Sequence, residues 1–402
     1  MRVLQVTPFD TTPAQTGSEQ RAHGLLSAFP DCGDEVRRYS QLLRKSSIKN
    51  GDLRKKVTVI PEYTEFRSRN PVYELVRAAT SYLLNVNSMT YIGDALEAFP
   101  TAELEDHLQW ADIIHVRDMW QVPAIAAMTE TPVVFSNHRL VDHQHTGYQT
   151  DGSVLMQLLG LNPREMREIE EAAVRAADAI LCHSEHEKDG LEDTYDPSVP
   201  IFIAPAAIES DRLQTDDDVA TTPQDHPDDT EYVGVFLGAG THKHNIDSAE
   251  ACVEFSNEMN ERGYDTHVYI VGNVGNVVDS PTPAENVTFT GYVDELGPYL
   301  SVADFALNPT IGKGVNVKML DYLSHEIPVV TTPQGTSGLG IDSETAIVAE
   351  RDELIDEFTS AVDEPQRMEL LGTNGYEYVE QNHTWDSVSR ELREEYYNWL
   401  ST

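Results

Sequence analysis

The chain has 402 residues, long enough for two or three domains, and 40% of them are hydrophobic, which is sufficient for sizeable cores. It carries 28 lysines and arginines against 68 aspartates and glutamates, a formal net charge of −40. This charge argues against general binding to nucleic acid or to an anionic membrane surface. The acidic residues are spread along the chain, as in proteins that work in high salt, where salt screens the self-repulsion.

The cysteines and the apolar segments indicate the compartment. Cys32, Cys182 and Cys252 are far apart and odd in number, so they predict no disulfide framework and fit a reducing cytoplasm. The N-terminal "MRVLQVTPF" is too short for a secretion signal and is typical of a strand. No run of 18 apolar residues is present, so we expect no membrane-spanning helix.

Short apolar runs alternate with helical segments in the first 205 residues. A strand predicted at 2–9 is followed by a loop that carries Gly17 and by a helical pattern over 18–29. Further buried strands are predicted at 111–116, 131–138 and 178–184, with a helix at 163–177 before the last of them. This alternation predicts a parallel sheet wrapped by helices.

The pattern breaks at residues 209–231, which are polar, acidic and proline-bearing and are typical of a surface loop or linker. Strands are then predicted at 232–240, 266–273, 286–291, 303–309, 327–332 and 346–350. The chain closes on a predicted amphipathic helix at 385–400, whose bulky aromatic residues suit docking on a core. The sequence therefore predicts two α/β halves of similar size.

The placement of lysine indicates a site. Ligands of doubly wound sheets bind beyond the carboxyl ends of the strands. After residue 200 the chain has only three lysines, Lys243, Lys313 and Lys318, and all follow predicted strands or open the next helix. Cations beside helix N-termini suit a phosphate or diphosphate, and chance placement is the alternative.

The stretch "GVNVKMLDYLSHEIPVVTTPQG" (314–335) gives this site more detail. Gly312 and Gly314 allow a loop to approach a ligand closely, and a helix is predicted from about 315 to 325. Lys318 and Asp321 are three residues apart and share one helix face. We expect Lys318 to bind phosphate and Asp321 to accept hydrogen bonds from vicinal hydroxyls. The alternative is a surface ion pair of little energetic value.

The run "NVTFTGYVDELGPYLSVADFALNPTIGKGVNVKMLDYLSHEIPVVTTPQG" resembles the GT-B-fold retaining glycosyltransferases of family 4, the group 1 set. The first half agrees more loosely, through "VLQVTPF", "ADIIHV", "TPVVFSNH" and "AADAILCHSE" followed by "IFIAPAAIE". The resemblance implies an α/β protein of two Rossmann-like doubly wound domains facing across a cleft. It places an acceptor-side domain at 1–205, a nucleotide-sugar-binding domain at 206–384, and a helix at 385–402 that completes the first domain.

The reaction that the resemblance implies moves a sugar from a UDP- or GDP-type donor to an acceptor hydroxyl, with retention and without a metal or other cofactor. Its implied catalytic residues are His138, Lys243 and Lys318. Its implied donor-binding residues are Gly17, Gly238, Gly240, Lys243, Gly314, Asn316, Lys318 and Asp321. A buried, satisfied histidine is the alternative for His138, and His143 and His145 are not expected to complete a metal site.

Some positions depart from the family pattern. Lys313 stands where the family usually has a glutamate, Asp321 replaces a longer glutamate, and Ala206–Ala207 replaces Asn-Gly. Two rival functions therefore stay open, a nucleotide-sugar 2-epimerase of the same fold and a non-catalytic sugar-nucleotide-binding partner. The resemblance implies a glycan or lipid-linked acceptor in surface-glycan synthesis, and thus a cytoplasmic protein with peripheral association at the inner face of the membrane.

Overall fold

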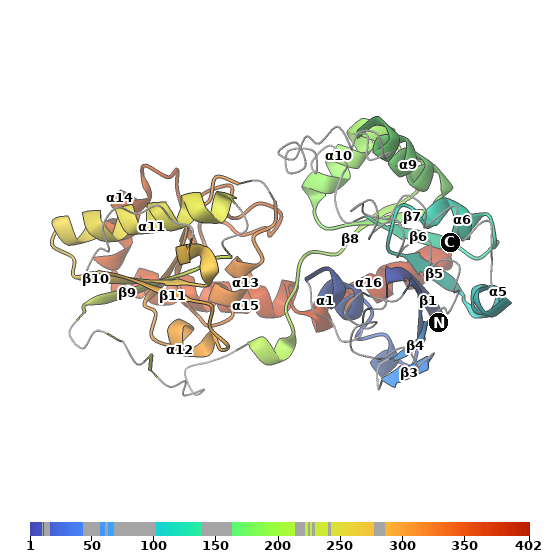
Figure 1. Ribbon diagram of the computed structural model, residues 1–402, viewed down its shortest axis with the longest axis horizontal. Helices are drawn as coiled ribbons and strands as arrows, with labels where there is room; N and C mark the ends of the chain where they lie inside the picture. The colour runs from blue at the N-terminus through green and yellow to red at the C-terminus, as the bar shows by residue number, and fades with distance from the viewer. Residues whose placement is uncertain are drawn as a thin grey trace. The chain divides into compact units, whose positions relative to one another are not determined.

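The computed structural model describes residues 1–9, 11, 17–42, 57–60, 63–67, 102–137, 163–213, 222–223, 226, 230–239, 243–276, 286–312 and 314–402. The chain divides into two compact units. Unit 1 contains Met1–Pro205 and Val388–Thr402, and unit 2 contains Ala206–Ser387. Each unit is a largely parallel sheet with flanking helices, so both are Rossmann-like (Figure 1).

The strands of unit 1 in the described chain are β1 (Arg2–Phe9), β2 (Glu35–Leu42), β3 (Val57–Ile60), β4 (Tyr63–Arg67), β5 (Ile113–Val116), β6 (Val133–Ser136), β7 (Ala179–Cys182) and β8 (Ile201–Ile203). Their order in the sheet is β3-β4-β2-β1-β5-β6-β7-β8. All neighbours pair in parallel except β3 and β4, which pair antiparallel at one edge. The chain reverses its direction of travel across the sheet between β2 and β5, on either side of β1, which is the topology of a doubly wound fold.

The helices of unit 1 in the described chain are α1 (Gly17–Gly24), α5 (Ala102–Trp110), α6 (Val122–Ala126), α9 (Pro163–Ala176), α10 (Glu185–Tyr195) and, from Val388 onward, α16 (Trp385–Leu400). α1 ends at Gly24, before the end of the helical pattern expected to residue 29, and the chain continues in turns to a short 3₁₀ helix at Pro30–Cys32. α16 matches the predicted helix in length. It returns to unit 1, where Ser389 Oγ accepts a hydrogen bond of 3.0 Å from the backbone N–H of Ala28.

The central strands of unit 1 follow from their composition. Every residue of β5, β6 and β7 is buried, because these strands are covered by helices on both faces. Such strands are expected to be continuous apolar runs rather than alternating ones. The side chains of Ile114, Val133, Phe135 and Ile180 join one core with residues of α5, α6 and α9.

The sequence pattern did not indicate four strands of unit 1, namely β2, β3, β4 and β8. In β2 the reason is that its segment "EVRRYSQL" is rich in charge. Arg38 is nevertheless fully buried there. Its Nε donates to Gln5 Oε1 at 2.5 Å, and its Nη2 donates to the carbonyl oxygen of Ala22 at 2.9 Å. The guanidinium also lies 3.9 Å from the centre of the Tyr63 ring. These tertiary contacts compensate the burial of a charge that the local sequence alone would place at the surface.

The strands of unit 2 in the described chain are β9 (Tyr232–Leu237), β10 (Thr266–Val271), β11 (Val287–Gly291), β12 (Phe305–Asn308), β13 (Val329–Thr331) and β14 (Ile347–Val348). They form one parallel sheet in the order β11-β10-β9-β12-β13-β14. Each lies within a segment that the sequence predicted as a strand. The topological switch point falls between β9 and β12, and the carboxyl ends of these two strands are where a ligand is expected.

The helices of unit 2 in the described chain are α11 (Lys243–Glu261), α12 (Gly297–Leu300), α13 (Lys318–Leu323), α14 (Leu354–Val362) and α15 (Pro365–Asn382). Side chains alternate across β9, so that Phe236 enters a core with α11 and α14, whereas Val235 and Leu237 enter a second core with α13. Figure 1 shows α11 and α14 on one face of this sheet and α12 on the other. The two faces together explain the near-complete burial of β9 and β10.

The chain enters and leaves unit 2 along paired segments. The backbone N–H of Ile208 donates to the carbonyl oxygen of His383, and the N–H of Trp385 donates to the carbonyl oxygen of Ile208, both at 2.9 Å. The two ring nitrogens of His383 lie 2.7 Å from the carbonyl oxygen of Ala206 and 2.9 Å from that of Leu339. These contacts fasten residues 206–208 to the start of α16.

Among the described residues, no helix is long and apolar enough to cross a membrane.

Candidate functional site

The loops after β9 and β10 lie close together at the carboxyl edge of the unit 2 sheet. The N–H of Gly238 donates to the carbonyl oxygen of Val271 at 2.8 Å. Gly272 has a φ of 111°, and a Cβ atom there would lie 2.3 Å from the carbonyl oxygen of Gly238. A Cβ on Gly238 would lie 2.7 Å from the Phe236 ring. The packing of the two loops therefore requires glycine at both positions. This requirement is independent of the donor contact predicted for Gly238.

α11 begins beside these loops at Lys243, whose side chain is exposed. Its third residue, Asn245, is buried and donates through Nδ2 to the carbonyl oxygen of Ala239 at 3.0 Å. The next residue after Lys243, His244, packs against the loop that follows β12, since a Cβ on Gly312 would lie 2.8 Å from its Cβ. The first turn of α11 is thus held between the ends of β9 and β12, with its backbone N–H groups at the carboxyl edge of the sheet.

Lys318 opens α13 on the other side of the switch point. The hydroxyl of Tyr322, one turn later, accepts a hydrogen bond of 2.7 Å from the N–H of Leu237 and so fixes α13 to the end of β9. Lys318 Nζ donates to Asn245 Oδ1 at 3.0 Å and lies 4.2 Å from the centre of the Phe236 ring. Burial lowers the pKa of this ammonium to about 8.

The partners of Lys318 are neutral. In the described part of the chain no carboxylate forms an ion pair with it, although 68 acidic residues are present in the sequence. An amide oxygen and the face of an aromatic ring orient a cation but do not neutralise it. A partly buried ammonium of this kind is a site for an anion, because an anion would restore the charge balance that burial removes.

The loop between β12 and α13 is fastened to the loop after β13. Gly314 has a φ of 118°, a conformation that favours glycine. Asn316 donates through Nδ2 to the carbonyl oxygens of Gly314 at 3.1 Å and Gln334 at 3.4 Å. Asn316 therefore ties two loops together. Its contact with the donor stays a prediction.

Asp321 and Lys318 both lie on α13 but contact different partners. Asp321 Oδ1 lies 2.5 Å from Nη2 of Arg212, and the Asp321 side chain is 13% exposed, against 42% for that of Arg212. Burial raises the pKa of Asp321, and the charge of Arg212 acts in the opposite direction. The surface ion pair between Lys318 and Asp321, which the sequence left open as an alternative, is not formed.

Two predicted site residues, His138 and Gly240, lie outside the described residues, as do Lys313, His143 and His145. Gly17 is the first residue of α1. The described chain at the end of β6 stops at Asn137, which is buried and whose N–H donates to the carbonyl oxygen of Leu181 at 2.9 Å. Within the residues that the structure describes, no group of three or more His, Cys, Asp and Glu side chains is arranged to hold a metal ion.

Unit 1 presents a carboxylate at the end of β5 that sequence reasoning missed. Burial raises the pKa of Asp118 to about 6, and the backbone N–H of Trp120, which donates to Asp118 Oδ1 at 3.2 Å, acts in the opposite direction together with Arg117. Asp118 sits where ligands of doubly wound sheets bind. The signal available in the sequence was the pair "RD" directly after the apolar run 111–116.

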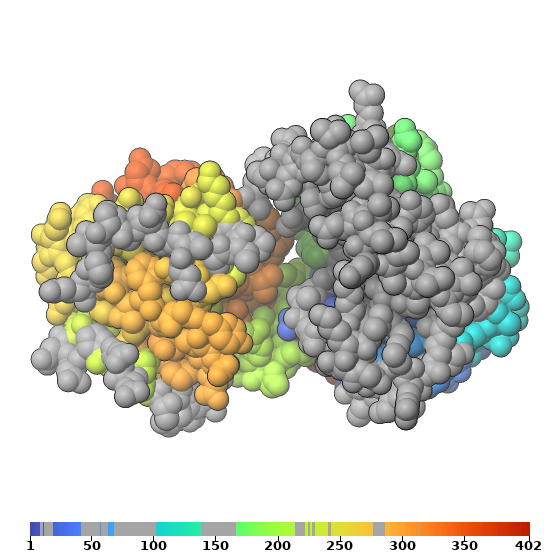
Figure 2. Space-filling model, in the orientation of Figure 1, coloured from blue at the N-terminus to red at the C-terminus, as the bar shows by residue number. Residues whose placement is uncertain are grey.

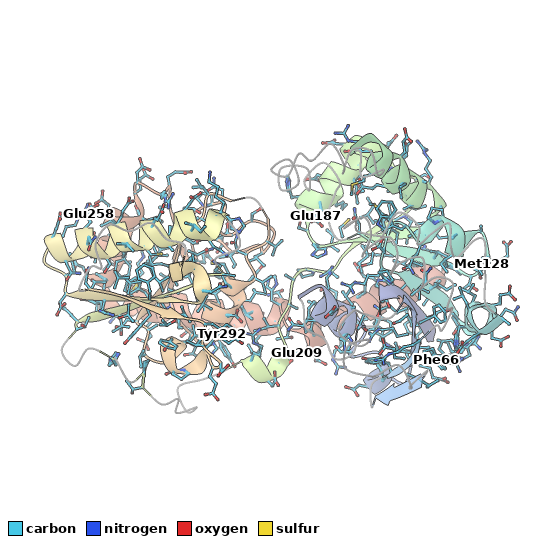
Figure 3. The ribbon with its side chains drawn as sticks, viewed as in Figure 1. Phe66, Met128, Glu187, Glu209, Glu258 and Tyr292 are labelled. Atoms are coloured by element: carbon cyan, nitrogen blue, oxygen red, sulfur yellow. The ribbon has the colours of Figure 1, made fainter. Side chains whose placement is uncertain are left out.

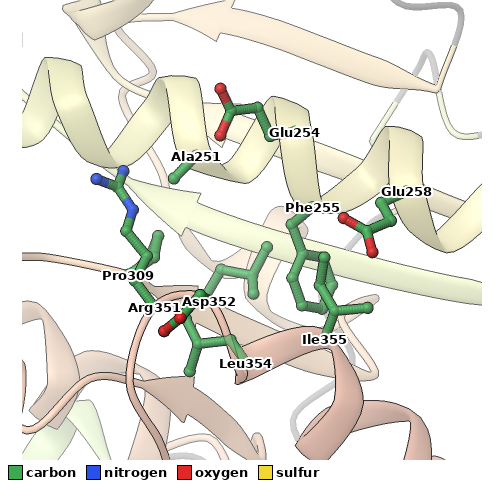
Figure 4. Close-up of a pocket in the computed structure, with 10 residues that line it drawn as sticks. Ala251, Glu254, Phe255, Glu258, Pro309, Arg351, Asp352, Leu354 and Ile355 are labelled. Carbon is green, nitrogen blue, oxygen red and sulfur yellow. The ribbon is translucent and has the colours of Figure 1, made fainter.

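A cavity of about 550 Å³ lies in unit 2 away from Lys318 and Asp321 (Figure 4). It is bounded by the middle of α11, the end of β12 and the segment that enters α14. Phe255 and Leu307 line it, together with Glu254, Glu258 and Asp352. These three carboxylates outnumber Arg351, which also lines the cavity, so the cavity is a poor candidate for an anionic ligand.

The outer surface of unit 2 carries one conspicuous aromatic residue. Tyr292, labelled in Figure 3, directly follows Gly291 at the end of β11 and is 80% exposed. The segment from there through α12 (orange) and the outer face of α11 (yellow) both reach the surface in the space-filling view (Figure 2). An exposed ring at the carboxyl end of a strand is available to a ligand of the same sheet edge.

Sequence models of two protein families match the chain. The model described as "Glycosyltransferase Family 4" matches residues 17–212, and the one described as "Glycosyl transferases group 1" matches residues 231–364. No curated protein matches the chain.

Among solved structures, the chain is similar to a sucrose-phosphate synthase from Thermosynechococcus elongatus, at 14% identity and a TM-score of 0.65, over 100% of this chain and 99% of that one. It is also similar to HepE of Anabaena in complex with UDP and glucose, at 10% identity and a TM-score of 0.62, over 99% and 100%. A third similar structure is a UDP-forming α,α-trehalose-phosphate synthase from Burkholderia xenovorans, at 10% identity and a TM-score of 0.63, over 100% and 98%.

The similarity to these structures shows the fold. The two family matches together span most of the chain and show a glycosyltransferase. The two Rossmann-like units correspond in order to the two matched segments. The chain is therefore a glycosyltransferase of the GT-B type, with a family 4 domain in its first half and a group 1 domain in its second.

Proposed function

We propose that the protein transfers a hexose-type sugar from a nucleoside-diphosphate sugar to an acceptor hydroxyl, with retention of the anomeric configuration. The donor diphosphate binds at the carboxyl edge of the unit 2 sheet, between the first turn of α11 and Lys318. Two solved structures of Anabaena HepE, one with UDP and glucose and one with UDP-glucose, support a donor of the UDP type.

The observation that carries the proposal is Lys318. Its ammonium is partly buried with only neutral partners in the described chain, and burial lowers its pKa to about 8. Such an arrangement costs stability unless an anion binds there. The backbone N–H groups at the N-terminus of α11, a helix of 19 residues, add a second source of positive potential, and Lys243 adds a third.

These groups act on the leaving group. As the bond between the anomeric carbon and the diphosphate oxygen breaks, negative charge develops on the diphosphate, and Lys318, Lys243 and the α11 amides stabilise it. The acceptor hydroxyl attacks from the face that the leaving group vacates and forms the new glycosidic bond. Its proton passes to the departing phosphate oxygen. This front-face course accounts for retention without a covalent intermediate on the enzyme.

Asp321 serves the nucleoside. Its carboxylate accepts hydrogen bonds from the two ribose hydroxyls, which do not change during the reaction. The acceptor belongs to unit 1, and we assign it to surface-glycan or lipid-linked glycan synthesis by analogy with the family.

A thermal-shift panel of UDP-, GDP- and dTDP-sugars in molar KCl tests donor binding, since a ligand that binds only the folded state raises its melting temperature. Proton NMR of the product then gives its anomeric configuration. We expect stabilisation by one donor class and a product with the donor's configuration. A panel without any shift, or an inverted product, would contradict the proposal.

A further inference from the structure

The structure pairs Asp321 with a residue from a segment that the sequence indicated only as a linker. Arg212 is the last residue of the 3₁₀ helix Ser210–Arg212, shortly after the chain enters unit 2. Its Nη2 lies 2.5 Å from Asp321 Oδ1. No other side chain in the described part of the chain forms an ion pair with this carboxylate.

The position of Arg212 is itself fixed. Its backbone N–H donates to the carbonyl oxygen of Glu209 at 3.0 Å. Four residues before Arg212, the backbone of Ile208 is hydrogen-bonded through its N–H to His383 and through its carbonyl oxygen to Trp385. The guanidinium therefore extends from a fastened turn toward α13, rather than from a loop held only by the ion pair.

The energetic reason for this contact is the burial of Asp321. An aspartate that is 13% exposed without a cation tends to take up a proton, and burial does raise the pKa of Asp321. A protonated carboxyl group has lost acceptor capacity that a diol requires. An arginine whose charge lies beside one carboxylate oxygen favours the ionised form and leaves the lone pairs of the other oxygen for hydroxyl groups.

We propose that Arg212 is a positioning residue that holds the Asp321 carboxylate ionised and correctly oriented to accept both ribose hydroxyls of the donor. This inference rests on the proposed function of the unit 2 site. The guanidinium lies against Oδ1, which is buried and accepts no hydrogen bond, so Arg212 acts through its charge and leaves Oδ2 as the oxygen for the ribose hydroxyls. Arg212 thereby makes nucleotide recognition depend on the segment where the chain enters unit 2.

The test is calorimetric titration with UDP and GDP, and with the 2′,3′-dideoxy form of whichever binds, in molar KCl. The variants are Arg212→Gln, Arg212→Lys and Asp321→Asn, together with the double variant Arg212→Gln/Asp321→Asn. Arg262→Gln is the matched control, because it removes an arginine of the same unit that pairs with Glu258 and Asp356 at the far end of α11.

We expect Arg212→Gln to weaken the ribonucleotide about tenfold or more, the size of a lost charge-assisted contact, and to leave the dideoxynucleotide unchanged. The affinity of Arg212→Lys for the ribonucleotide should stay within about threefold of the wild-type affinity. The affinity of the control Arg262→Gln should equal that of the wild type. Arg212→Gln should have no further effect in the Asp321→Asn background.

Equal loss for the ribose and dideoxy ligands would show a general structural role and overturn the inference. Unchanged or tighter binding by Arg212→Gln would also overturn it, the latter because Arg212 would then compete with ribose. If Arg212→Gln does not fold, Arg212→Lys and Asp321→Asn still decide. Arg212→Lys should prefer the ribose ligand to the dideoxy ligand as the wild type does, and Asp321→Asn should lose that preference. The same preference in all folded variants would refute the idea. Wild-type protein that binds neither nucleotide would refute the proposed function first, and this inference with it.

Discussion

Replacing Lys318 with methionine should make the protein more stable and, at the same time, unable to hold a diphosphate. The ammonium has a pKa of about 8 instead of 10.5, which corresponds to a cost of about 3 kcal/mol for carrying the charge at neutral pH. Lys318 is only partly buried, so solvent reduces this figure to about 2–3 kcal/mol. Methionine is unbranched and apolar, so it fills the space of the lysine stem without the charge.

The substitution also removes the hydrogen bond from Lys318 to Asn245 Oδ1, which offsets about 1 kcal/mol of the gain. A net stabilisation of about 1–2 kcal/mol remains and should raise the melting temperature of unit 2 by about 2–8 °C. Scanning calorimetry of the two proteins without ligand measures it. Lys188→Met is the control, because Lys188 is a surface residue paired with Glu185 and should change stability by less than about 0.5 kcal/mol.

A drop in melting temperature for Lys318→Met would refute the reasoning. It would mean that the ammonium and its neutral partners stabilise the fold, and the lysine would then need no anion to explain its presence. A rise without any loss of donor binding would separate the buried charge from the diphosphate and contradict the assignment of the site.

Four further outcomes are expected, one at Lys318 and three elsewhere in the molecule. Donor affinity should fall as the pH rises above about 8, because Lys318 loses its proton there in the free protein and a bound diphosphate requires the protonated ammonium. In calorimetric titrations, Lys318→Arg should abolish this pH dependence. Molar KCl should raise the melting temperature over dilute buffer because of the net charge of −40, and an unchanged value would contradict a salt-adapted surface. Burial beside three arginines lowers the pKa of His115 to about 3, so the unfolded chain binds the extra proton between pH 6.5 and 3; stability should therefore be lost as the pH falls through that range, and His115→Gln should flatten the loss in acid-melting curves. Removing residues 385–402 should lower the melting temperature of unit 1 by exposing the surface that Tyr396 covers, and a truncated protein with normal melting would argue against that docking.

Much of unit 2 could be predicted from the sequence, because its strands are short apolar runs between clear turn signals. β9 through β14 all fall inside predicted segments, although the strands themselves are shorter by one to three residues at some ends. The reason is that hydrogen-bonded pairing stops before the apolar run does, where glycine or proline lets the chain leave the sheet. The edge of the pattern is therefore less informative than its centre.

Unit 1 shows where the pattern fails. β2 carries Arg37 and Arg38 in adjacent positions, and a strand with two charges in its middle resembles a surface loop. Arg38 can be buried only because Gln5, Ala22 and Tyr63 lie around it in the folded protein. None of these contacts is local in sequence, so no periodicity predicts them.

The site shows the same division. The rarity of lysine indicated Lys318 as a special residue, and the helix pattern placed Asp321 on the same helix. Their partners were not predictable, since Asn245 lies 73 residues from Lys318 and Arg212 lies in a segment that composition assigns to a linker. Spacing along one helix suggests that two side chains are near each other, but tertiary contacts decide which way each one points.

Calorimetric titration of the wild type and Lys318→Met with a nucleoside diphosphate and with the nucleoside alone, in molar KCl at pH 7, tests the central claim most directly. The account predicts that Lys318→Met loses at least about tenfold in affinity for the diphosphate and none for the nucleoside. The diphosphate contacts the ammonium, whereas the nucleoside contacts Asp321. Equal affinities of the two proteins for the diphosphate would contradict the claim that this lysine holds the donor.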